Sequence, residues 1–295
     1  MKQEDSRFSR NQTVCIVGLG LIGGSYAKGF RRLGVQRILA VDIDEQALKA
    51  AKADGVIDEG YTAGCPELAQ ASVVIFCMAA NTMIQFIRDN GHFFKPGTLL
   101  TDVAGIKGQT GAVIQEILPP GLDFVPGHPM AGREGQGYGM SRAEIFDGAN
   151  YIIVPCRHNR LEHIQQIEAM AYALGCAHVV TVSPEEHDKL IAYTSSLPHV
   201  LATALVNSEA MSSHTKYFVA GSFRDGTRVA DINAPLWTTL FLANKENLLY
   251  EIQRFTESLQ EFAHMLRQED AADMTDYLQK AAVRRRELVH ETHSH

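Results

Sequence analysis

Residues 13–24, with the sequence TVCIVGLGLIGG, decide the fold that we expect for the first half of this chain. The stretch begins with an apolar run rich in β-branched side chains, which is typical of a buried strand. A turn with Gly18, Gly20 and Gly23 follows directly, and residues 22–33 have the pattern of a helix. The first glycine permits a tight turn, the second lets a ligand approach the backbone, and the third lets the helix pack on the strand.

This turn also predicts a binding site for the pyrophosphate of a dinucleotide. The N-terminus of the helix would supply unpaired N–H groups and positive potential. Asp42 ends the next predicted strand about 20 residues later, where an acidic residue binds a ribose, and its charge favours NAD over NADP. We therefore predict that the cofactor is contacted by Gly18, Gly20, Leu21, Ile22, Gly23, Asp42, Cys77 and Asp102. Asp44 is instead expected to cap the following helix.

Strands and helices alternate through the first 182 residues. The predicted strands are residues 13–18, 37–41, 73–78, 98–102, 124–126, 151–155 and 178–181, and the predicted helices are residues 22–33, 45–53, 107–118 and 160–174. Alternation of this kind predicts an α/β fold, a Rossmann-type, doubly wound parallel sheet with helices on both faces. We assign residues 1–182 to this NAD-binding domain.

No strand pattern follows residue 182. Ser183, Pro184 and Glu186 form a strong helix start, with a capping hydroxyl, proline at the first helical position and an acid at the third. An apolar stripe at three- and four-residue steps then predicts a long helix, and its members are Leu248, Leu249, Ile252, Phe255, Leu259, Phe262 and Leu266. We expect residues 183–295 to form an all-helical substrate and dimerisation domain.

Composition narrows the classes of function. The chain has 295 residues and a net charge of −7, which disfavours nucleic acid because binding to phosphates needs a basic face. The longest apolar run, residues 73–80, is too short to cross a bilayer, and residues 1–12 lack the apolar stretch of a secretory signal. Five cysteines without paired spacing favour reduced thiols in the cytoplasm. We predict no metal site, since the histidines at the C-terminal end are typical of a solvated terminus.

Three further stretches are candidates for a substrate site. They are TDVAGIK at residues 101–107, PGHPMAGR at 126–133 and GSFRDGTR at 221–228. The first two follow predicted strands, and ligands of open α/β sheets bind outside the carboxyl ends of strands. Pro129 favours an extended backbone at His128, which keeps that histidine out of a helix.

Together with TSSLPH at residues 194–199 and PLW at 235–237, these motifs resemble the prephenate/arogenate dehydrogenase family of tyrosine biosynthesis. The motifs occur in family order over residues 14–237. The resemblance implies a prephenate dehydrogenase, which passes hydride from the hydroxyl-bearing ring carbon of prephenate to NAD. Carbon dioxide leaves as the ring becomes aromatic, and the product is 4-hydroxyphenylpyruvate. An arogenate or dual-substrate cyclohexadienyl dehydrogenase is the alternative, and a catalytically inactive NAD-binding dimer is a more distant one.

The resemblance also implies roles for individual residues. His128 matches the catalytic histidine that accepts the hydroxyl proton, and Arg228 matches the arginine that binds the ring carboxylate. Further candidates for substrate binding, each with an alternative structural role, are Lys107, Arg133, Ser195, Ser196, His199 and Trp237. Many relatives have serine where this chain has Gly105, so this chain lacks the hydroxyl that bonds their catalytic histidine. Many relatives also have histidine where this chain has Ser196, and Thr194, Ser195, Ser196 or a water is the candidate replacement.

The helical part carries more apolar surface than one small domain readily buries. Besides the stripe of seven residues, the segments 200–206, 236–242 and 274–282 are apolar. A symmetric partner is the usual cover for such surface. We therefore predict a homodimer through the helical domain, a family property that the resemblance also implies.

Overall fold

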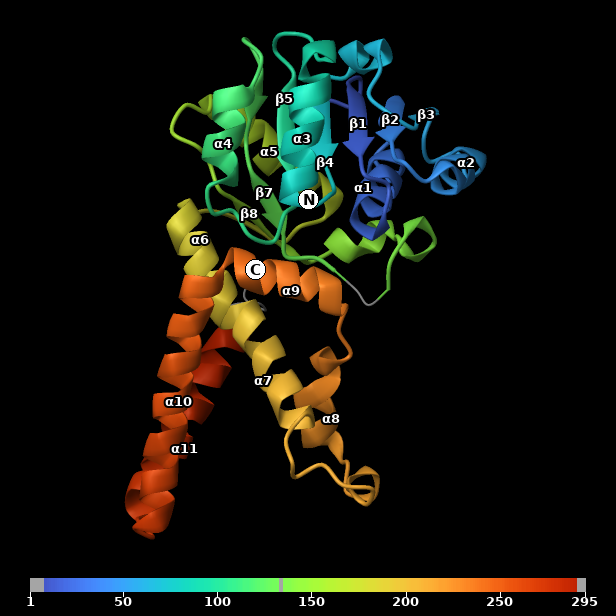
Figure 1. Ribbon diagram of the computed structural model, residues 1–295. Coiled ribbons are helices and arrows are strands. Elements are labelled where there is room, and N and C mark those ends of the chain that lie inside the picture. The colour runs from blue at the N-terminus through green and yellow to red at the C-terminus, as the bar shows by residue number, and fades with distance from the viewer. Residues whose placement is uncertain (1–7, 133–134, 291–295) are drawn as a thin grey trace. The chain divides into compact units, whose positions relative to one another are not determined.

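The computed structural model describes residues 8–132 and 135–290 and divides into two compact units, Met1–Ile191 and Ala192–His295 (Figure 1). The strands are β1 Thr13–Val17, β2 Arg37–Val41, β3 Glu59–Tyr61, β4 Val73–Phe76, β5 Leu99–Asp102, β6 Asp123–Phe124, β7 Gly127–Pro129, β8 Asn150–Ile153 and β9 His178–Thr181. The helices of the first unit are α1 Leu21–Arg32, α2 Glu45–Ala53, α3 Ala80–Asn90, α4 Thr110–Ile117, α5 Leu161–Leu174 and α6 Pro184–Ile191. The compact units place α6 with the first part of the chain, whereas the boundary at 182/183 stays a prediction.

The first six strands form one parallel sheet in the order β3-β2-β1-β4-β5-β6. The chain reverses direction across the sheet between β1 and β4, the position where doubly wound sheets bind ligands at their carboxyl edge. The expected doubly wound sheet is confirmed, and the glycine turn lies at this switch point because it follows β1 directly.

A second sheet of three strands was not expected. Its order is β7-β8-β9, and β7 runs antiparallel to β8, with His128 opposite Ile152. His128 therefore lies in a strand and not in a loop beyond one. Glycine and proline flank this histidine and are depleted in strands, but proline is tolerated on an edge strand, which β7 is. The short strand β3 and the helix α3 were also not predicted, because their sequences likewise lack a clear local signal for a strand or a helix.

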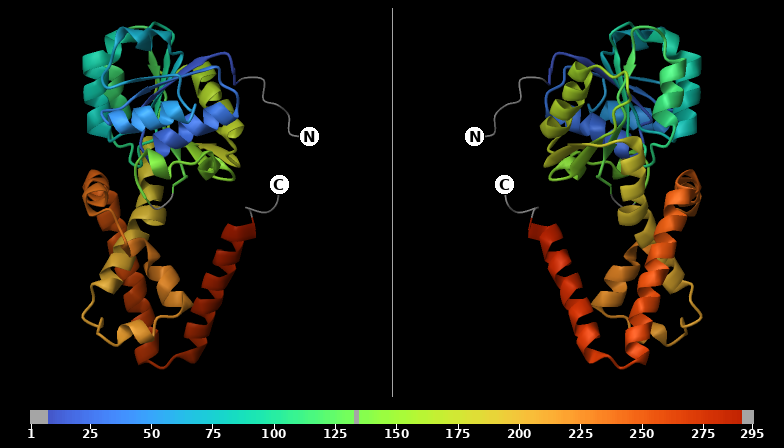
Figure 2. Two further views of the ribbon diagram at one scale, coloured as in Figure 1. Left: turned by 90° about the vertical axis from the view of Figure 1, so that its right-hand side faces the viewer. Right: turned by 90° about the vertical axis from the view of Figure 1, so that its left-hand side faces the viewer.

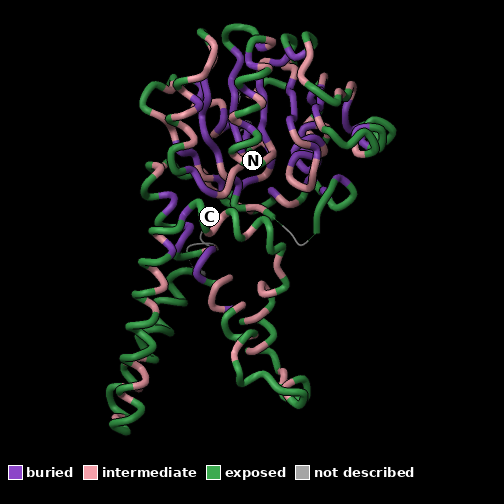
Figure 3. Tube along the Cα trace, in the orientation of Figure 1, coloured by how far each residue is buried: buried purple, intermediate pink, exposed green. Residues whose placement is uncertain are grey.

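Apolar side chains cover both faces of the main sheet. On one face, Tyr26 of α1 packs on Phe146 with ring centroids 4.6 Å apart, and α5 contributes Ile167 and Met170. On the other face, α3 and α4 bury Met83, Ile87 and Ile114 against β4 and β5. Figure 3 shows the buried positions concentrated in the strands of this unit.

Two helix starts in this unit follow the expected capping chemistry. The Asp44 carboxylate accepts hydrogen bonds from the amides of Gln46 and Ala47, as predicted for the N-cap of α2. The Ser183 hydroxyl accepts a hydrogen bond of 3.1 Å from the Glu186 amide at the start of α6.

The second unit consists of helices in its described residues. They are α7 Leu197–Val206, α8 Gly221–Thr227, α9 Ala234–Ala243, α10 Lys245–Arg267 and α11 Ala271–His290. Residues Ala192–Ser196 form a π-helical turn before α7, and Pro198 at the start of that helix lacks the N–H that a continuous α-helix would need. No helix in the described part of the chain combines the length and hydropathy needed to cross a membrane.

The apolar stripe does lie on one long helix, α10, as predicted. α10 and α11 diverge from the turn that joins them (Figure 2). Of the stripe, only Leu248 is buried, while Leu249, Leu259 and Leu266 are more than half exposed. The second unit thus leaves three leucines of the stripe exposed, and Ile252, Phe255 and Phe262 only half-buried.

Candidate active site

The glycine turn has the backbone geometry that only glycine accommodates. Gly18 has φ +94°, and a Cβ there would lie 2.6 Å from the carbonyl oxygen of Cys77. A Cβ on Gly23 would lie 1.8 Å from the carbonyl oxygen of Gly18. At Gly20, in contrast, a Cβ would meet no atom within 4 Å. The turn is therefore closed on its protein side and open beside Gly20.

The open side is suited to a phosphate. Gly20 is the N-cap of α1, no side chain caps the helix, and its first turn, which contains Leu21 and Ile22, has no acidic residue. The N–H groups and the positive end of the helix dipole are thus left for an anion.

Asp42 ties the glycine turn to the end of β2. Its carboxylate accepts hydrogen bonds from the amides of Leu19 and Asp44. A carboxylate has about four acceptor positions, so two remain for ribose hydroxyls. The described residues of the turn and Asp42 fit a dinucleotide, and their contacts with it stay a prediction.

Cys77 and Asp102 follow and end the neighbouring strands β4 and β5. The Cys77 amide donates to the Val17 carbonyl at 2.7 Å, and its own carbonyl packs beside Gly18. Burial raises the pKa of the Cys77 thiol, so the thiol stays protonated. Cys77 therefore shapes the turn by its backbone.

The Asp102 carboxylate is fully engaged with the protein. Each of its oxygens accepts a bond from the Lys107 ammonium, at 3.0 and 2.9 Å. The amides of Gly127 and Ala104 donate to Oδ1 and Oδ2 respectively. A contact of this carboxylate with the cofactor would have to displace one of these donors, and its role in cofactor binding stays a prediction.

Lys107 is enclosed by acceptors. Its side chain is 3% exposed, and Nζ donates to Asp102 and, at 2.6 Å, to the carbonyl of Gly127. Burial lowers the pKa of Lys107, and the Asp102 charge opposes that shift. The described contacts make Lys107 the link between β5 and β7 rather than a free cation for the substrate, because Asp102 and Gly127 already use its three donors.

His128 is held by a buried histidine that the sequence did not single out. Nδ1 of His128 lies 2.9 Å from Nε2 of His187 on α6. Nδ1 of His187 lies 2.7 Å from Oδ1 of Asp188. The Asp188 carboxylate accepts bonds from the amides of Lys107 and Gly108, at 2.9 and 2.7 Å. The sequence carried one signal for this arrangement, an adjacent histidine and aspartate on a capped helix.

The surroundings set the charges of this group. Burial lowers the pKa of His128 well below its usual value, and the charges of Lys107 and His187 act in the same direction. Burial by itself would raise the pKa of Asp188, but hydrogen bonds from His187 and the two amides hold that pKa below its usual value. At neutral pH, His128 is therefore neutral and Asp188 is ionised.

Four further predicted substrate residues lie in the second unit. Ser195 and Ser196 belong to the π-helical turn, and Ser196 is buried. His199 donates from Nδ1 to the Ser195 carbonyl at 2.8 Å and stacks on Trp237 with ring centroids 3.6 Å apart. These residues form one cluster on α7, α9 and the turn between α6 and α7.

Arg228 begins the short helical turn Arg228–Ala230 and is exposed. Arg133 lies outside the described residues. Gly105 carries no hydroxyl, and His187 is the hydrogen-bond partner that the structure provides for His128.

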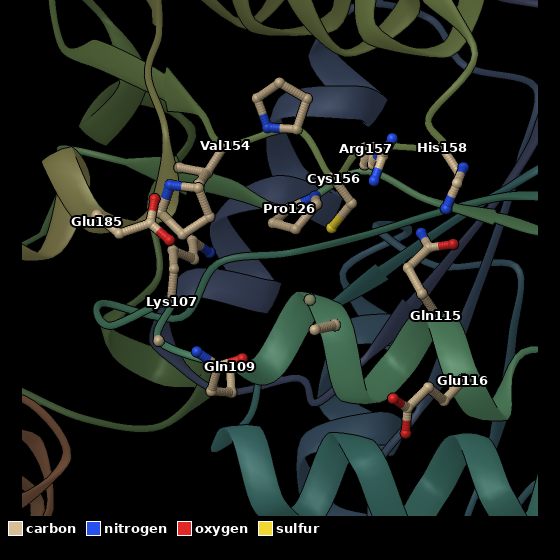
Figure 4. A pocket seen from close by; sticks show the side chains of 15 residues that line it. Lys107, Gln109, Gln115, Glu116, Pro126, Val154, Cys156, Arg157, His158 and Glu185 are labelled. Atoms are coloured by element: carbon tan, nitrogen blue, oxygen red, sulfur yellow. The ribbon is translucent and has the colours of Figure 1, made fainter.

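A cavity of about 500 Å³ also lies in the first unit, lined by Lys107, Gln109, Gln115, Cys156 and Glu185 among others (Figure 4). Neither His128 nor any residue of the glycine turn lines it. The cavity is therefore separate from the predicted cofactor crevice. Within the described residues, no group of three or more His, Cys, Asp or Glu side chains is placed to hold a metal ion.

Comparison with known proteins identifies the family. Two family models match, "Prephenate dehydrogenase, nucleotide-binding domain" over residues 26–180 and "Prephenate dehydrogenase, dimerization domain" over residues 183–280. The chain belongs to the prephenate dehydrogenase family. The first match begins within α1, so the assignment of the glycine turn rests on its own geometry.

Individual members of the prephenate dehydrogenase family agree over most of the chain. A prephenate dehydrogenase of Bacillus subtilis is 32% identical over 91% of this chain and 74% of that protein. A cyclohexadienyl dehydrogenase of Zymomonas mobilis is 30% identical over 90% of both. The crystal structure of a prephenate dehydrogenase from A. aeolicus with hydroxyphenyl propionate and NAD⁺ has a TM-score of 0.85 at 30% identity, covering 94% of this chain and 98% of that one. The predicted family, fold class and oxidoreductase class are confirmed.

Alanine at two glycines of the turn should separate folding from cofactor binding. Gly23→Ala places a methyl group against the Gly18 carbonyl, so we expect the variant to be destabilised by roughly 1–3 kcal/mol, the usual cost of overpacking. Gly20→Ala meets no protein atom and should keep the stability of the wild type, yet weaken NAD binding by filling the open side of the turn. Denaturant unfolding and calorimetric titration with NAD measure both effects. Unchanged NAD affinity in Gly20→Ala would show that the phosphates bind elsewhere.

Asp42 should set the preference for NAD. A 2′-phosphate beside this carboxylate is repelled, so we expect Asp42→Ser to reduce the ratio of NAD to NADP specificity constants at least about 10-fold. Asp44→Ala is the matched control, because it removes the cap of α2, at about 1 kcal/mol of stability, without removing the ribose partner. A wild-type enzyme that uses NADP as well as NAD would contradict the assignment.

Proposed function

We propose that this chain is an NAD-dependent prephenate dehydrogenase, which oxidatively decarboxylates prephenate to 4-hydroxyphenylpyruvate in tyrosine biosynthesis. Membership of the family supports the reaction class, and the A. aeolicus relative was crystallised with NAD⁺. The observation that carries the proposal is the state of His128: it is a neutral imidazole whose Nδ1 is held by His187.

The residues of this chain suit the chemistry. NAD, held by the glycine turn and Asp42, would supply the acceptor for the hydride of the hydroxyl-bearing carbon of the substrate. His128 Nε2 accepts the hydroxyl proton as that carbon becomes a carbonyl, and the C–C bond to the ring carboxylate breaks with loss of carbon dioxide. Aromatisation of the resulting ring to the phenol completes the reaction. Among the described residues, none donates a hydrogen bond to His128 Nε2, so this nitrogen is available as a base.

For Arg228 we propose the role of substrate anchor. A guanidinium binds a carboxylate with two parallel hydrogen bonds, and Arg228 is an exposed arginine in a motif of the family. The stacked pair of His199 and Trp237 is our candidate for a wall of the substrate pocket, with Ser195 and Ser196 as nearby hydroxyl groups.

Arogenate, or both substrates, is the alternative within this family, and the Zymomonas mobilis cyclohexadienyl dehydrogenase favours keeping it open. The test is spectrophotometric: NADH formation is followed with prephenate and arogenate in parallel, each with NAD and with NADP. We expect turnover of prephenate with NAD. Turnover of arogenate alone would replace the proposed substrate, and binding of NAD without turnover of either would support an inactive NAD-binding protein.

Two variants should divide catalysis from substrate capture. His128→Asn should lower kcat by roughly 100-fold or more, the usual scale for a positioned base, and leave the affinity for NAD unchanged. Arg228→Ala should raise KM, with at least about a 10-fold lower kcat/KM for the loss of a charge-assisted pair.

Because His128 must be neutral, and its pKa is lowered, wild-type kcat/KM should fall only as the pH drops below about 6.5. A loss of activity that begins above this pH would point to another essential group.

We further propose that the chain is a homodimer through its second unit. The exposed side chains of Leu249, Leu259 and Leu266, which are 54, 55 and 58% exposed, support this assembly. One matched family model is described as a dimerization domain, and it covers these residues.

The cytoplasm is the compartment that we propose, because its reducing environment suits the free cysteines.

Light scattering should give twice the mass of one chain, 32.5 kDa, at micromolar concentration. We expect Leu259→Glu to weaken the dimer, because it places a charge in an apolar interface of more than about 2,000 Å². Leu161→Glu on α5, at a leucine of the first unit that is 68% exposed, is the control and should leave the dimer intact. A wild-type mass of one chain would contradict the proposed assembly.

A further inference from the structure

We propose that His187 and Asp188 are positioning residues that hold His128 in the one tautomer able to act as the base. The inference deepens the proposed function, since it concerns the base of that reaction. It rests on three side chains joined by consecutive hydrogen bonds, those of Asp188, His187 and His128, in which the Asp188 carboxylate determines the donor and acceptor roles of the two histidines.

The chain of hydrogen bonds begins at an acceptor. An ionised Asp188 carboxylate cannot donate, so the proton between it and His187 belongs to Nδ1 of His187. A neutral His187 then has a lone pair at Nε2, 2.9 Å from Nδ1 of His128. For a hydrogen bond to form there, Nδ1 of His128 must carry the proton. The lone pair of His128 is thereby left on Nε2.

The Asp188 carboxylate is fixed by backbone groups. The amide of Lys107 donates to Oδ1 and the amide of Gly108 donates to Oδ2. The side chain of Lys107 in turn binds Asp102 and the carbonyl of Gly127, the residue before His128. Lys107 therefore contacts both ends of this series of hydrogen bonds. At one end it binds the strand that carries His128, and at the other it binds the carboxylate that orients His187.

The arrangement also accommodates the proton that the reaction transfers. When Nε2 of His128 takes the substrate hydroxyl proton, Nδ1 keeps its own, and the imidazolium still donates to His187. The positive charge then lies on His128, and the hydrogen bonds through His187 connect it to the negative Asp188 carboxylate. Lys107 is another charged group that acts on His128: its charge lowers the pKa of that histidine, and Lys107 is itself paired with Asp102.

A second distribution of protons would be inactive. If His187 carried protons on both nitrogens, its Nε2–H would point at His128, and Nδ1 of His128 would have to accept. Neutral His128 would then carry its proton on Nε2 and could not take one from the substrate.

A purely structural role makes a different prediction. In that case His187 and Asp188 would only anchor α6 to the backbone at Lys107 and Gly108, and their loss would reduce stability without changing the tautomer of His128. The chain offers a matched control for this role. His163 on α5 is buried, and its Nδ1 lies 2.8 Å from Oδ2 of Asp123.

The experiment measures the tautomer directly. ¹⁵N-histidine-labelled enzyme without substrate is examined by long-range ¹H–¹⁵N correlation at neutral pH, and the His128 signals are assigned by their loss in His128→Asn. We expect wild-type His128 to carry its proton on Nδ1. In His187→Leu the acceptor is gone, so we expect the Nε2–H tautomer to become populated. We also expect kcat with prephenate to fall at least about 10-fold, a part of the effect of a positioned base, with the affinity for NAD unchanged.

Two more variants keep the test decisive. His163→Leu should lose stability to a similar extent while retaining wild-type kcat and the His128 tautomer. His187→Gln, whose side chain can donate to Asp188 and accept from His128, should keep the Nδ1–H tautomer and recover much of the activity that His187→Leu loses; it also serves if His187→Leu does not fold. A wild-type His128 protonated on Nε2, or a His187→Leu enzyme with unchanged tautomer and kcat, would overturn the proposal. Since the spectra need no substrate, an enzyme that shows the expected tautomers but oxidises neither prephenate nor arogenate would refute the proposed function and support the positioning role.

Discussion

The buried ion pair between Lys107 and Asp102 is the interaction on which the candidate active site depends. The ammonium of Lys107 joins Asp102 at the end of β5 to the carbonyl of Gly127. The backbone amide of Lys107 donates to the Asp188 carboxylate. Removing one partner of a buried pair leaves an uncompensated charge, at a cost of roughly 3–5 kcal/mol. Both charges also have backbone partners, so the pair joins the strand of His128 to the end of β5 without leaving a buried charge unsatisfied.

A second constraint operates at the switch point of the main sheet. Gly18 and Gly23 approach neighbouring carbonyl groups too closely for any side chain, and Asp42 binds the amide of Leu19 within the same turn. The helix N-terminus behind the turn is consequently held open without a protein cap. The first unit thus has two rigid and separately anchored features, an anion-binding turn and a held histidine. A hydride-transfer enzyme needs both a cofactor site and a base, and rigidity in each limits the reorganisation required during the reaction.

The second unit differs from the first in how its apolar surface is covered. Its long helix α10 carries the apolar stripe that the sequence predicts, yet of that stripe only Leu248 is buried by its own chain. Hydrophobic periodicity identifies the apolar face of a helix. It does not show whether that face packs on the same chain or on a second copy. For that reason the helix followed from the sequence, whereas its proposed covering by a second copy depends on how this unit packs.

The sequence by itself determined the elements that have strong local signals. β2, α2 and β9 have the predicted bounds, since β-branched runs and the Asp44 cap act within a few residues. It also determined the glycine turn, because only glycine readily adopts the backbone of Gly18, whereas the role of Asp42 as the ribose-binding acid stays a prediction. Only the tertiary structure decided the environment of His128. Its strand lacks local strand signals, its partner His187 lies 59 residues away, and the charge of Lys107 is neutralised by a carboxylate five residues earlier. These pairings come from packing β5, β7 and α6 together in the first unit, where burial requires each polar group to find a partner that sequence spacing does not reveal.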